Sequence, residues 1–434
     1  MTTHRSARAT ALACLFTLAA TPAAQAGSFY LQEQSVRGAG RAFSGEVADC
    51  GVASLWWNPA SIACSRREVY LGLHGILLDS RVEDRGSTLT RPLAPGGVTT
   101  AVGGQPVAID PVQGGVVPNA AVAIPLNDRF VLGLSAMAPY NLSTEYDDAA
   151  FTRYDALKSS VLTVDLQATL AARVTDWLDV GVGVSGEYVS AELSSALPNL
   201  APGSPDGLSE LEGDGIDLGW TVGARAHAGR WEAGLSYRSA IEHELDGEVT
   251  ISGLAGPLAA ANVDTDGVAT FTTPWMASAG VRFAVNDRLT LNGQINRIGW
   301  SEFDAIRVSY PGGGDVIVQD YKDTTSGAVG LDYRLNEQVT LRTGVAFDPT
   351  PTRDERRTAR IPDEDRMLYS VGATIQPRDG LMMDAALTYI AIDTATINDD
   401  RVLYEGTGAD TVSRLRGEAT GSGVVASLGM RLAF

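Results

Sequence analysis

The sequence predicts an all-β protein: a 14-stranded antiparallel transmembrane β-barrel with an N-terminal plug, or hatch, in its lumen. Three observations carry this prediction. Segments in which apolar and polar residues alternate recur along the chain, short turns alternate with long polar loops, and the last alternating segment ends at the aromatic residue Phe434. Short turns at one end of the strands and long loops at the other are typical of barrels in an outer membrane.

Composition excludes several other classes of protein. The chain has 434 residues, of which 44% are hydrophobic and 20% charged, and its mean hydropathy is +0.01. A bundle of membrane helices would need several runs of ~20 apolar residues, which this composition does not supply. Asp and Glu number 52 against 33 Lys and Arg, giving a net charge of −19. Nucleic acid is therefore not an expected partner, because phosphate binding needs clustered basic residues.

The first 26 residues are predicted to be a secretory signal peptide. Basic residues precede an apolar run at 9–20, and the small-x-small site Ala24-Gln25-Ala26 follows it. The apolar run is too short to span a bilayer as an anchor. We therefore divide the chain into a signal peptide at 1–26, a plug at 27–67 and a barrel at 68–434.

The turns set the expected number of strands. Residues 162–174, 289–296 and 338–348 each alternate strictly and so have one apolar and one polar face. Six short turns define six hairpins, and one strand before them and one after them bring the total to fourteen, with both chain ends on the short-turn, periplasmic side. The short turns are expected at 127–129, 175–177, 228–230, 286–288, 335–337 and 377–380, and the long loops near 79–116, 140–160, 193–214, 247–270, 305–323, 349–366 and 394–420.

The segment at 27–67 lacks alternation and contains Cys50 and Cys64. Exported proteins meet an oxidising compartment, so this pair predicts a disulfide, with two free buried thiols as the alternative. Closing this loop would add about 3 kcal/mol of stability in the chain-entropy model. The spacing does not fit a metal site, because no Cys-x-x-Cys is present. Bonded or not, the segment contains enough bulky apolar residues to form a compact plug.

Catalytic and cofactor motifs are missing from the sequence. Its 4 histidines include no His-Glu-x-x-His pair, and no local pattern supports a Ser–His pair. Residues 311–315 are Gly-rich but lack the Gly-Lys-Ser/Thr of a phosphate loop. We therefore expect no enzyme activity, no catalytic residues, no metal and no cofactor.

Two blocks of the chain resemble the FadL/TodX family of outer-membrane channels for hydrophobic compounds. The first, GSFYLQEQSVRGAGRAFSGEVADCGVASLWWNPASIA, is similar to the plug of that family, and the second, RTGVAFDPTPTRDERRTARIPDEDRMLYSVGA, to its late-barrel signature. Shorter similarities are YRSAIEHEL and GWSEFD. The matching plug elements are Leu31/Glu33, Gly38/Gly40/Arg41/Ala42 and Asn58/Pro59/Ala60.

The resemblance implies passive uptake of hydrophobic compounds, most of all long-chain fatty acids. The ligand would occupy an apolar pocket, and a hatch rearrangement would let it leave sideways through the barrel wall. Phe29 matches a residue that reaches the pocket, and Lys322 matches one that pairs the fatty-acid carboxylate. The family's other carboxylate-binding Arg falls after Tyr188, where this chain has Glu192, Ser194 and Ser195.

The remaining residues implied by the resemblance concern gating. Asn58, Pro59 and Ala60 are expected to hold the hatch against the wall. Asn141 stands where a Gly helps to kink the third strand, and Pro139 beside it cannot donate a ladder hydrogen bond. A local defect in the wall is therefore expected at this point.

Several alternatives stay open at this stage. The ligand is either a fatty acid or an aromatic or aliphatic hydrocarbon, and the other classes are a general diffusion porin or structural barrel and a soluble secreted β-domain. For a barrel we expect a monomer in the outer membrane of a Gram-negative bacterium. Its expected partners are a hydrophobic small molecule, outer-membrane lipid and lipopolysaccharide, and the barrel-assembly machinery, which would read Phe434.

Overall fold

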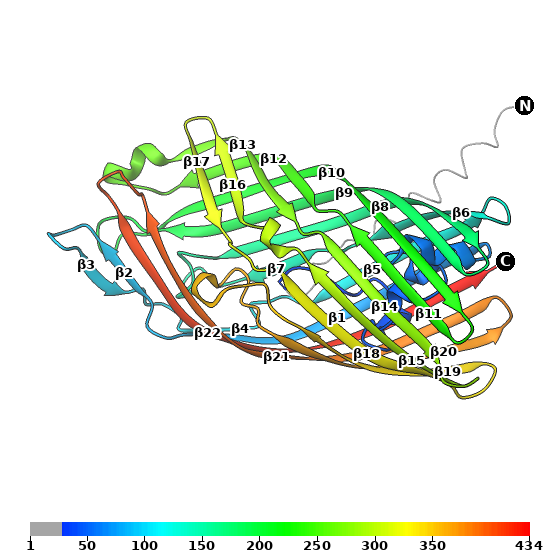
Figure 1. Ribbon diagram of the computed structural model, residues 1–434. Coiled ribbons are helices and arrows are strands. Elements are labelled where there is room, and N and C mark those ends of the chain that lie inside the picture. The colour runs from blue at the N-terminus through cyan, green and yellow to red at the C-terminus, as the bar shows by residue number, and fades with distance from the viewer. Residues whose placement is uncertain (1–27) are drawn as a thin grey trace, which may run out of the picture.

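One antiparallel sheet closes on itself to form the barrel (Figure 1). The computed structural model describes residues 28–434, so the predicted signal peptide lies outside the described residues. Strand β1 (Glu68–Asp84) pairs with β22 (Thr411–Ala433) on one side, from Glu68↔Ala433 to Asp84↔Gly417, and with β5 (Gly115–Pro125) on the other. The predicted closed barrel of 14 antiparallel strands is confirmed.

Several wall strands are interrupted and therefore consist of two segments. The strands between β5 and β22 are β6 (Phe130–Met137) with β7 (Asn141–Glu145), β8 (Lys158–Thr175), β9 (Leu178–Leu197), β10 (Gly207–Ala228), β11 (Trp231–Arg238) with β12 (Ile241–Ser252), β13 (Val263–Thr273) with β14 (Met276–Ala284), β15 (Leu289–Ile298) with β16 (Ala305–Tyr310), β17 (Gly313–Val318) with β18 (Thr324–Arg334), β19 (Val339–Asp348), β20 (Arg366–Arg378) and β21 (Leu381–Leu403). The short strands β2 (Thr88–Arg91), β3 (Val98–Ala101) and β4 (Val107–Ile109) lie in the first long connection.

The six short turns connect strands where the sequence predicts them, for example between β8 and β9 and between β20 and β21. The long loops differ from the prediction. Residues 193–214 and 394–420 lie mostly in β9, β10, β21 and β22, which continue past the expected strand ends. Polar residues are frequent in these extensions and the apolar residues do not alternate strictly, so the hydrogen-bonded ladder continues without the pattern that reveals a strand.

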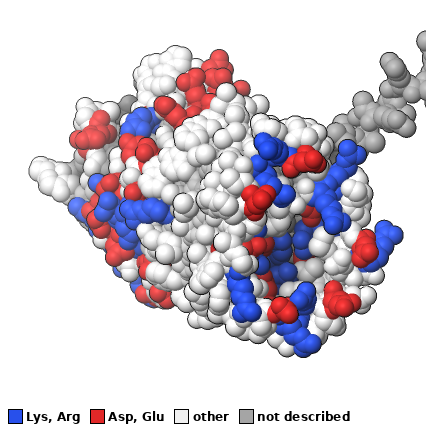
Figure 2. All heavy atoms as spheres, turned by 45° about the vertical axis from the view of Figure 1, so that its right-hand side comes forward, with Lys and Arg blue, Asp and Glu red and all other residues white. Residues whose placement is uncertain are grey.

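The two faces of the wall have opposite polarity. Large apolar side chains face outward, with Leu218 76% and Leu77 70% exposed, whereas most inward-facing polar side chains are buried. Figure 2 shows charged side chains gathered at the two ends of the barrel, with a band of uncharged side chains between them. This band is the surface that hydrocarbon covers in a membrane barrel.

The chain before β1 folds inside the barrel near its short-turn end (Figure 1). It contains α2 (Val36–Ala39) and the 3₁₀ turns η1 (Glu46–Ala48), η2 (Val52–Ser54) and η3 (Pro59–Cys64). We call residues 28–67 the hatch. Two further 3₁₀ turns of the outer end are η4 (Gly256–Ala261) and η6 (Asp354–Arg356), and η5 (Trp300–Glu302) lies between β15 and β16.

A disulfide joins Cys50 and Cys64 of the hatch, with their Cα atoms 6.2 Å apart. Within residues 28–434, no helix has both the length and the apolar character that are needed to cross a membrane.

The apolar band predicts how the barrel responds to an outward charge. Val329 on β18 is 60% exposed and lies in the band, so Val329→Arg should destabilise the barrel by about 2–4 kcal/mol, because hydrocarbon does not solvate the charge. Val316 on β17 is 55% exposed in the outer hairpin, and Val316→Arg should cost no more than about 1 kcal/mol. Urea unfolding in lipid vesicles, followed by heat-modifiable gel migration, measures both. Equal losses would contradict the position of the band.

Candidate functional site

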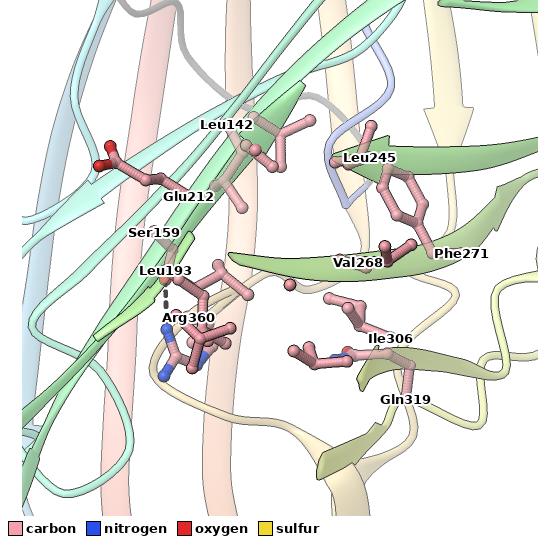
Figure 3. A pocket seen from close by; sticks show the side chains of 18 of the residues that line it. Leu142, Ser159, Leu193, Glu212, Leu245, Val268, Phe271, Ile306, Gln319 and Arg360 are labelled. Carbon is pink, nitrogen blue, oxygen red and sulfur yellow. Dashed lines mark hydrogen bonds between the residues drawn. The ribbon is translucent and has the colours of Figure 1, made fainter. Parts of the chain in front are cut away.

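An apolar cavity, partly open to solvent, lies inside the barrel above the hatch, and its empty space together with the open solvent at its mouth is about 830 Å³. The strands that enclose it are neighbours in one part of the wall, β7, β8, β9, β10, β12, β13 and β16, and most of the side chains that they contribute are apolar. Figure 3 shows several of these side chains around the central space. The lining includes Leu142, Val161, Leu193, Leu245, Val249, Phe271, Ile306 and Val308.

Phe29 of the hatch lines this cavity and is 2% exposed, so one ligand-binding residue predicted from the sequence does lie at the site. Its ring packs against Tyr140 at 5.6 Å, Trp300 at 5.2 Å and Phe303 at 5.1 Å between ring centroids. Tilted and edge-on aromatic pairs at these distances are favourable beyond the area that they bury. The aromatic cluster therefore couples the start of the hatch to the cavity wall.

Arg360, in the loop before β20, brings a positive charge to the cavity. Its side chain is 6% exposed, and its Nη1 donates to Ser159 Oγ at 3.0 Å and to the Lys158 carbonyl at 3.3 Å (Figure 3). Burial lowers the pKa of Arg360 to about 10, while the nearby carboxylate of Asp155 opposes the shift. The guanidinium is therefore still charged at neutral pH.

Asp155 competes only partly for this charge. Its Oδ1 lies 3.9 Å from Arg360 Nε but 3.1 Å from Arg401 Nη2, and its Oδ2 accepts a hydrogen bond from the Ala359 amide. Arg360 Nε has no hydrogen-bond partner among the described residues. Glu212 also borders the cavity, but it is exposed and its carboxylate points away from the other lining side chains in Figure 3. Arg360 is thus placed to accept an anionic ligand group.

The structure does not bring Lys322 to the cavity, which differs from the expectation. Its side chain is exposed, and its amide donates to the Pro351 carbonyl at 2.9 Å. The preceding residue, Tyr321, turns inward and packs on Trp300 and Phe303 at 5.8 and 5.2 Å. Adjacent residues of an extended segment face opposite sides, so Lys322 points outward.

Sequence reasoning missed Arg360, although it lies within the late-barrel block. The available signal was an arginine directly before an apolar residue, Ile361, in a loop otherwise rich in charge. Which of the loop's several arginines turns inward depends on how the loop folds back over the barrel mouth.

The wall is broken at residues 138–140, between β6 and β7, as the sequence suggested for Pro139 and Asn141. The hatch fills the break. The Leu31 amide donates to the Pro139 carbonyl at 2.7 Å, and the Asn141 amide donates to the Phe29 carbonyl at 2.8 Å. On this side β7 forms only an isolated bridge, from Thr144 to Val112. Residues 29–31 therefore take the place of a neighbouring strand.

Asn58 ties the hatch to the wall. Its Oδ1 caps η3 by accepting from the Ala60 amide at 2.9 Å, and its Nδ2 donates to the carbonyls of Val47 at 2.7 Å and Ala224 at 3.0 Å. Glycine is required opposite, because a Cβ on Gly223 would lie 2.1 Å from Asn58 Oδ1. The residues after Asn58 make a similar approach at Gly181 of β9, where a Cβ would lie 2.4 Å from the carbonyl carbon of Pro59.

A buried ionic network joins the hatch to the wall on another side. Arg41 contacts Glu46 and Asp49 of the hatch, both at 2.5 Å, and Asp332 of β18 at 2.9 Å. Arg282 of β14 contacts Asp49 and Asp332, both at 2.9 Å. Burial alone raises the pKa of Asp49, but Arg282, Arg37 and Arg41 hold that pKa well below its ordinary value. Asp49 therefore stays charged at neutral pH.

Comparison with known proteins gives a family match over nearly the whole chain. The model of the family described as outer membrane protein transport protein (OMPP1/FadL/TodX) matches residues 17–434. Outer membrane protein P1 of Haemophilus influenzae is 27% identical over 92% of this chain and 94% of its own length. The long-chain fatty acid transport protein of Escherichia coli O6:H1 is 28% identical over 88% of this chain and 90% of its own.

Solved structures share the fold. A Pseudomonas aeruginosa FadL homologue has a TM-score of 0.79 and 24% identity, over 94% of this chain and 100% of that one. The Ralstonia pickettii toluene transporter TbuX has a TM-score of 0.65 and 18% identity, over 93% and 99%. At these identities the likeness supports the barrel architecture and leaves the ligand undetermined.

The contacts of Asn58 predict a loosened hatch in Asn58→Ala. The variant loses the cap, worth about 1 kcal/mol, and leaves the Val47 and Ala224 carbonyls without their donor. Hydrogen exchange of the hatch amides should speed up about tenfold while barrel amides keep their protection. Asn336→Ala is the matched control, because Asn336 Oδ1 accepts from the amides of Gln338 and Val339 within its own short turn, and it should leave hatch exchange unchanged. Unchanged exchange in Asn58→Ala would contradict the anchoring role.

Proposed function

The chain belongs to the OMPP1/FadL/TodX family of outer membrane transport proteins, and we propose that it takes up long-chain fatty acids passively across the outer membrane. The observation that carries this proposal is the buried guanidinium of Arg360 in a cavity whose other lining side chains are mostly apolar. A ligand that matches both features has one anionic group and a long hydrocarbon chain.

Hydrophobic burial and the pairing of charges both favour binding of such an amphiphile. Each CH₂ group moved from water into the cavity contributes about 0.8 kcal/mol, so a long chain supplies most of the affinity. A carboxylate beside Arg360 would form a charge-assisted hydrogen bond with its guanidinium. A relative of 28% identity is named a long-chain fatty acid transport protein, which is consistent with this choice.

The wall break offers an exit that avoids water. Phe29 lines the cavity, and the carbonyl of the same residue accepts the hydrogen bond from Asn141 at the break. Displacing residues 29–31 would therefore open the cavity and the wall together. An apolar solute would pass from the cavity through the opening into lipid without entering an aqueous channel.

A hydrocarbon channel is the second candidate, because apart from Arg360 the inward side chains of the cavity are largely apolar. Neutral hydrocarbons would gain binding free energy from burial of their apolar surface, but they would gain none from the charge of Arg360. A general diffusion porin fits less well, because the buried hatch occupies the lumen.

The role of Arg360 predicts selective loss in Arg360→Gln. Affinity for palmitate should fall roughly 10- to 100-fold, the value of a hydrogen bond to a charged group, whereas affinity for hexadecane should change less than about threefold. Equilibrium binding to the detergent-purified barrel with radiolabelled ligands measures both.

Lys322→Ala is the matched control, since it removes an exposed positive charge outside the cavity. It should leave palmitate binding unchanged. If Lys322→Ala weakened palmitate binding and Arg360→Gln did not, the carboxylate site would have to be moved to Lys322. Equal loss of both ligands in Arg360→Gln would indicate a packing role.

Locking the N-terminal segment to the wall tests the exit. Tyr30 and Tyr140 form an antiparallel bridge. The hydrogen bonds are made by the residues on either side of them, so the two tyrosines are a non-hydrogen-bonded pair, the type in which the Cα atoms lie closer together. In a Cys50→Ser/Cys64→Ser background, Tyr30→Cys/Tyr140→Cys should form a disulfide that abolishes uptake until a reductant is added. Each single cysteine variant controls for the lost tyrosine. Full uptake by the oxidised double variant would rule out this exit.

A further inference from the structure

Three acidic side chains, two of them fully buried and Asp217 partly exposed, gather on strands that also form the apolar cavity. Asp165 of β8 and Glu187 of β9 are register partners, both facing inward, and are 0% and 1% exposed. His243 of β12 is 0% exposed, with its Nε2 3.3 Å from Glu187 Oε1 and its Nδ1 3.2 Å from Asp217 Oδ2. We call these four residues the acidic floor.

The negative charge of the acidic floor is only partly balanced. Arg238 of β11 is its nearest cation, with Nη1 3.6 Å from Asp165 Oδ2. That guanidinium also donates to the Trp56 carbonyl at 3.3 Å and to Gln167 Oε1 at 3.0 Å. Neither Asp165 oxygen, nor Glu187 Oε1, has a hydrogen-bond partner among the described residues. Three carboxylates thus share one arginine and one histidine, with unused acceptor atoms.

The strands place this floor beyond the inner end of the cavity, on the side away from Arg360. None of its four residues lines the cavity, and the buried residues Thr163 and Val189 lie between the floor and the lining. On β8, Ser159 contacts Arg360 and Val161 lines the cavity, and the same inward face continues to Asp165, about 20 Å along the strand from Ser159. On β12, Leu245 lines the cavity and the next inward residue is His243. The His243 ring lies 5.3 Å from that of Phe271, another lining residue.

We propose that the acidic floor determines the direction in which the ligand lies in the cavity. It also excludes molecules that carry an anionic group at the end far from Arg360. This inference rests on the proposed function. Arg360 attracts a carboxylate at the outer end, and the uncompensated carboxylates repel one at the inner end, where low dielectric strengthens the repulsion. A monocarboxylate therefore binds with its head outward and its alkyl end toward the floor, and an α,ω-dicarboxylate is rejected.

The test compares ligands that differ only at the far end. Palmitate, its ω-amino derivative and the α,ω-dicarboxylate of the same length are each titrated against radiolabelled palmitate on the full-length purified barrel. The amino and dicarboxylate ligands both place a charge at the inner end of the cavity, on the side of the floor, so the ratio of their affinities cancels most of the cost of removing that charge from water. The wild-type protein should prefer the ω-amino ligand by at least about tenfold, equal to 1.4 kcal/mol.

Asp165→Asn/Glu187→Gln should remove this preference, to within about threefold, while palmitate still binds. The matched control is Asp214→Asn/Asp246→Asn, another cross-strand pair of acids with the same change in charge. Both of these residues are exposed on the outer faces of β10 and β12, so this variant should keep the wild-type preference. Heat-modifiable migration and palmitate binding establish that each variant is folded. The single variants Asp165→Asn and Glu187→Gln replace the double variant if it does not fold.

The outcomes separate this inference from the proposed function. If palmitate binds in an Arg360-dependent way and the wild-type protein does not discriminate between the two charged ligands, the acidic floor has no selective role. The same conclusion follows if the preference survives neutralisation of Asp165 and Glu187, or if the outer control pair abolishes it equally. Failure of palmitate itself to bind to the wild-type protein would overturn the proposed function as well.

Discussion

The buried ionic network between hatch and wall is the interaction on which the rest of the structure depends. Arg41 bridges two hatch carboxylates and Asp332 of the wall, and Arg282 contacts two of the same acids from the wall side. Removing charges from water is expensive, and an unpaired buried charge costs several kcal/mol. The hatch and the wall therefore satisfy one another's charges only when the hatch occupies its place in the lumen.

This placement divides the lumen into two environments. The short-turn end is filled by the hatch and its charged and polar contacts, whereas the space above it is lined mainly by apolar side chains. An apolar cavity can stay free of water only if nothing polar lines most of its surface. Arg360 brings a buried charge to the cavity from the outer loops, and the acidic floor lies beyond the lining on the side of the hatch.

The start of the hatch connects this cavity to the membrane-facing wall. Residues 29–31 pair with the broken strand at Pro139 and Asn141, and the ring of Phe29 lies in the aromatic cluster beside the cavity. One short segment thus closes both the break in the barrel wall and the adjoining side of the cavity. Because the segment has few wall hydrogen bonds compared with a full strand, it is the element best suited to move while the barrel stays intact.

The sequence by itself determined the elements that depend on local pattern. Alternation and turn residues were sufficient for the fourteen strands and six short turns, because the period of two and the turn chemistry are written in neighbouring residues. The hatch segment was predicted from its lack of alternation and its site residues through the FadL/TodX resemblance; of these, Phe29 and Asn58 do contact the wall or the loop beside it.

Only the tertiary structure decided what depends on distant segments meeting. The outer strand extensions carry no apolar alternation, so 193–214 and 394–420 were taken for loops although they pair as strands. Lys322 and Arg360 are both loop cations in the sequence, yet one is exposed and the other buried against Ser159. That difference arises because a loop folded over the barrel mouth is positioned by contacts with strands about two hundred residues away. No local pattern records such contacts.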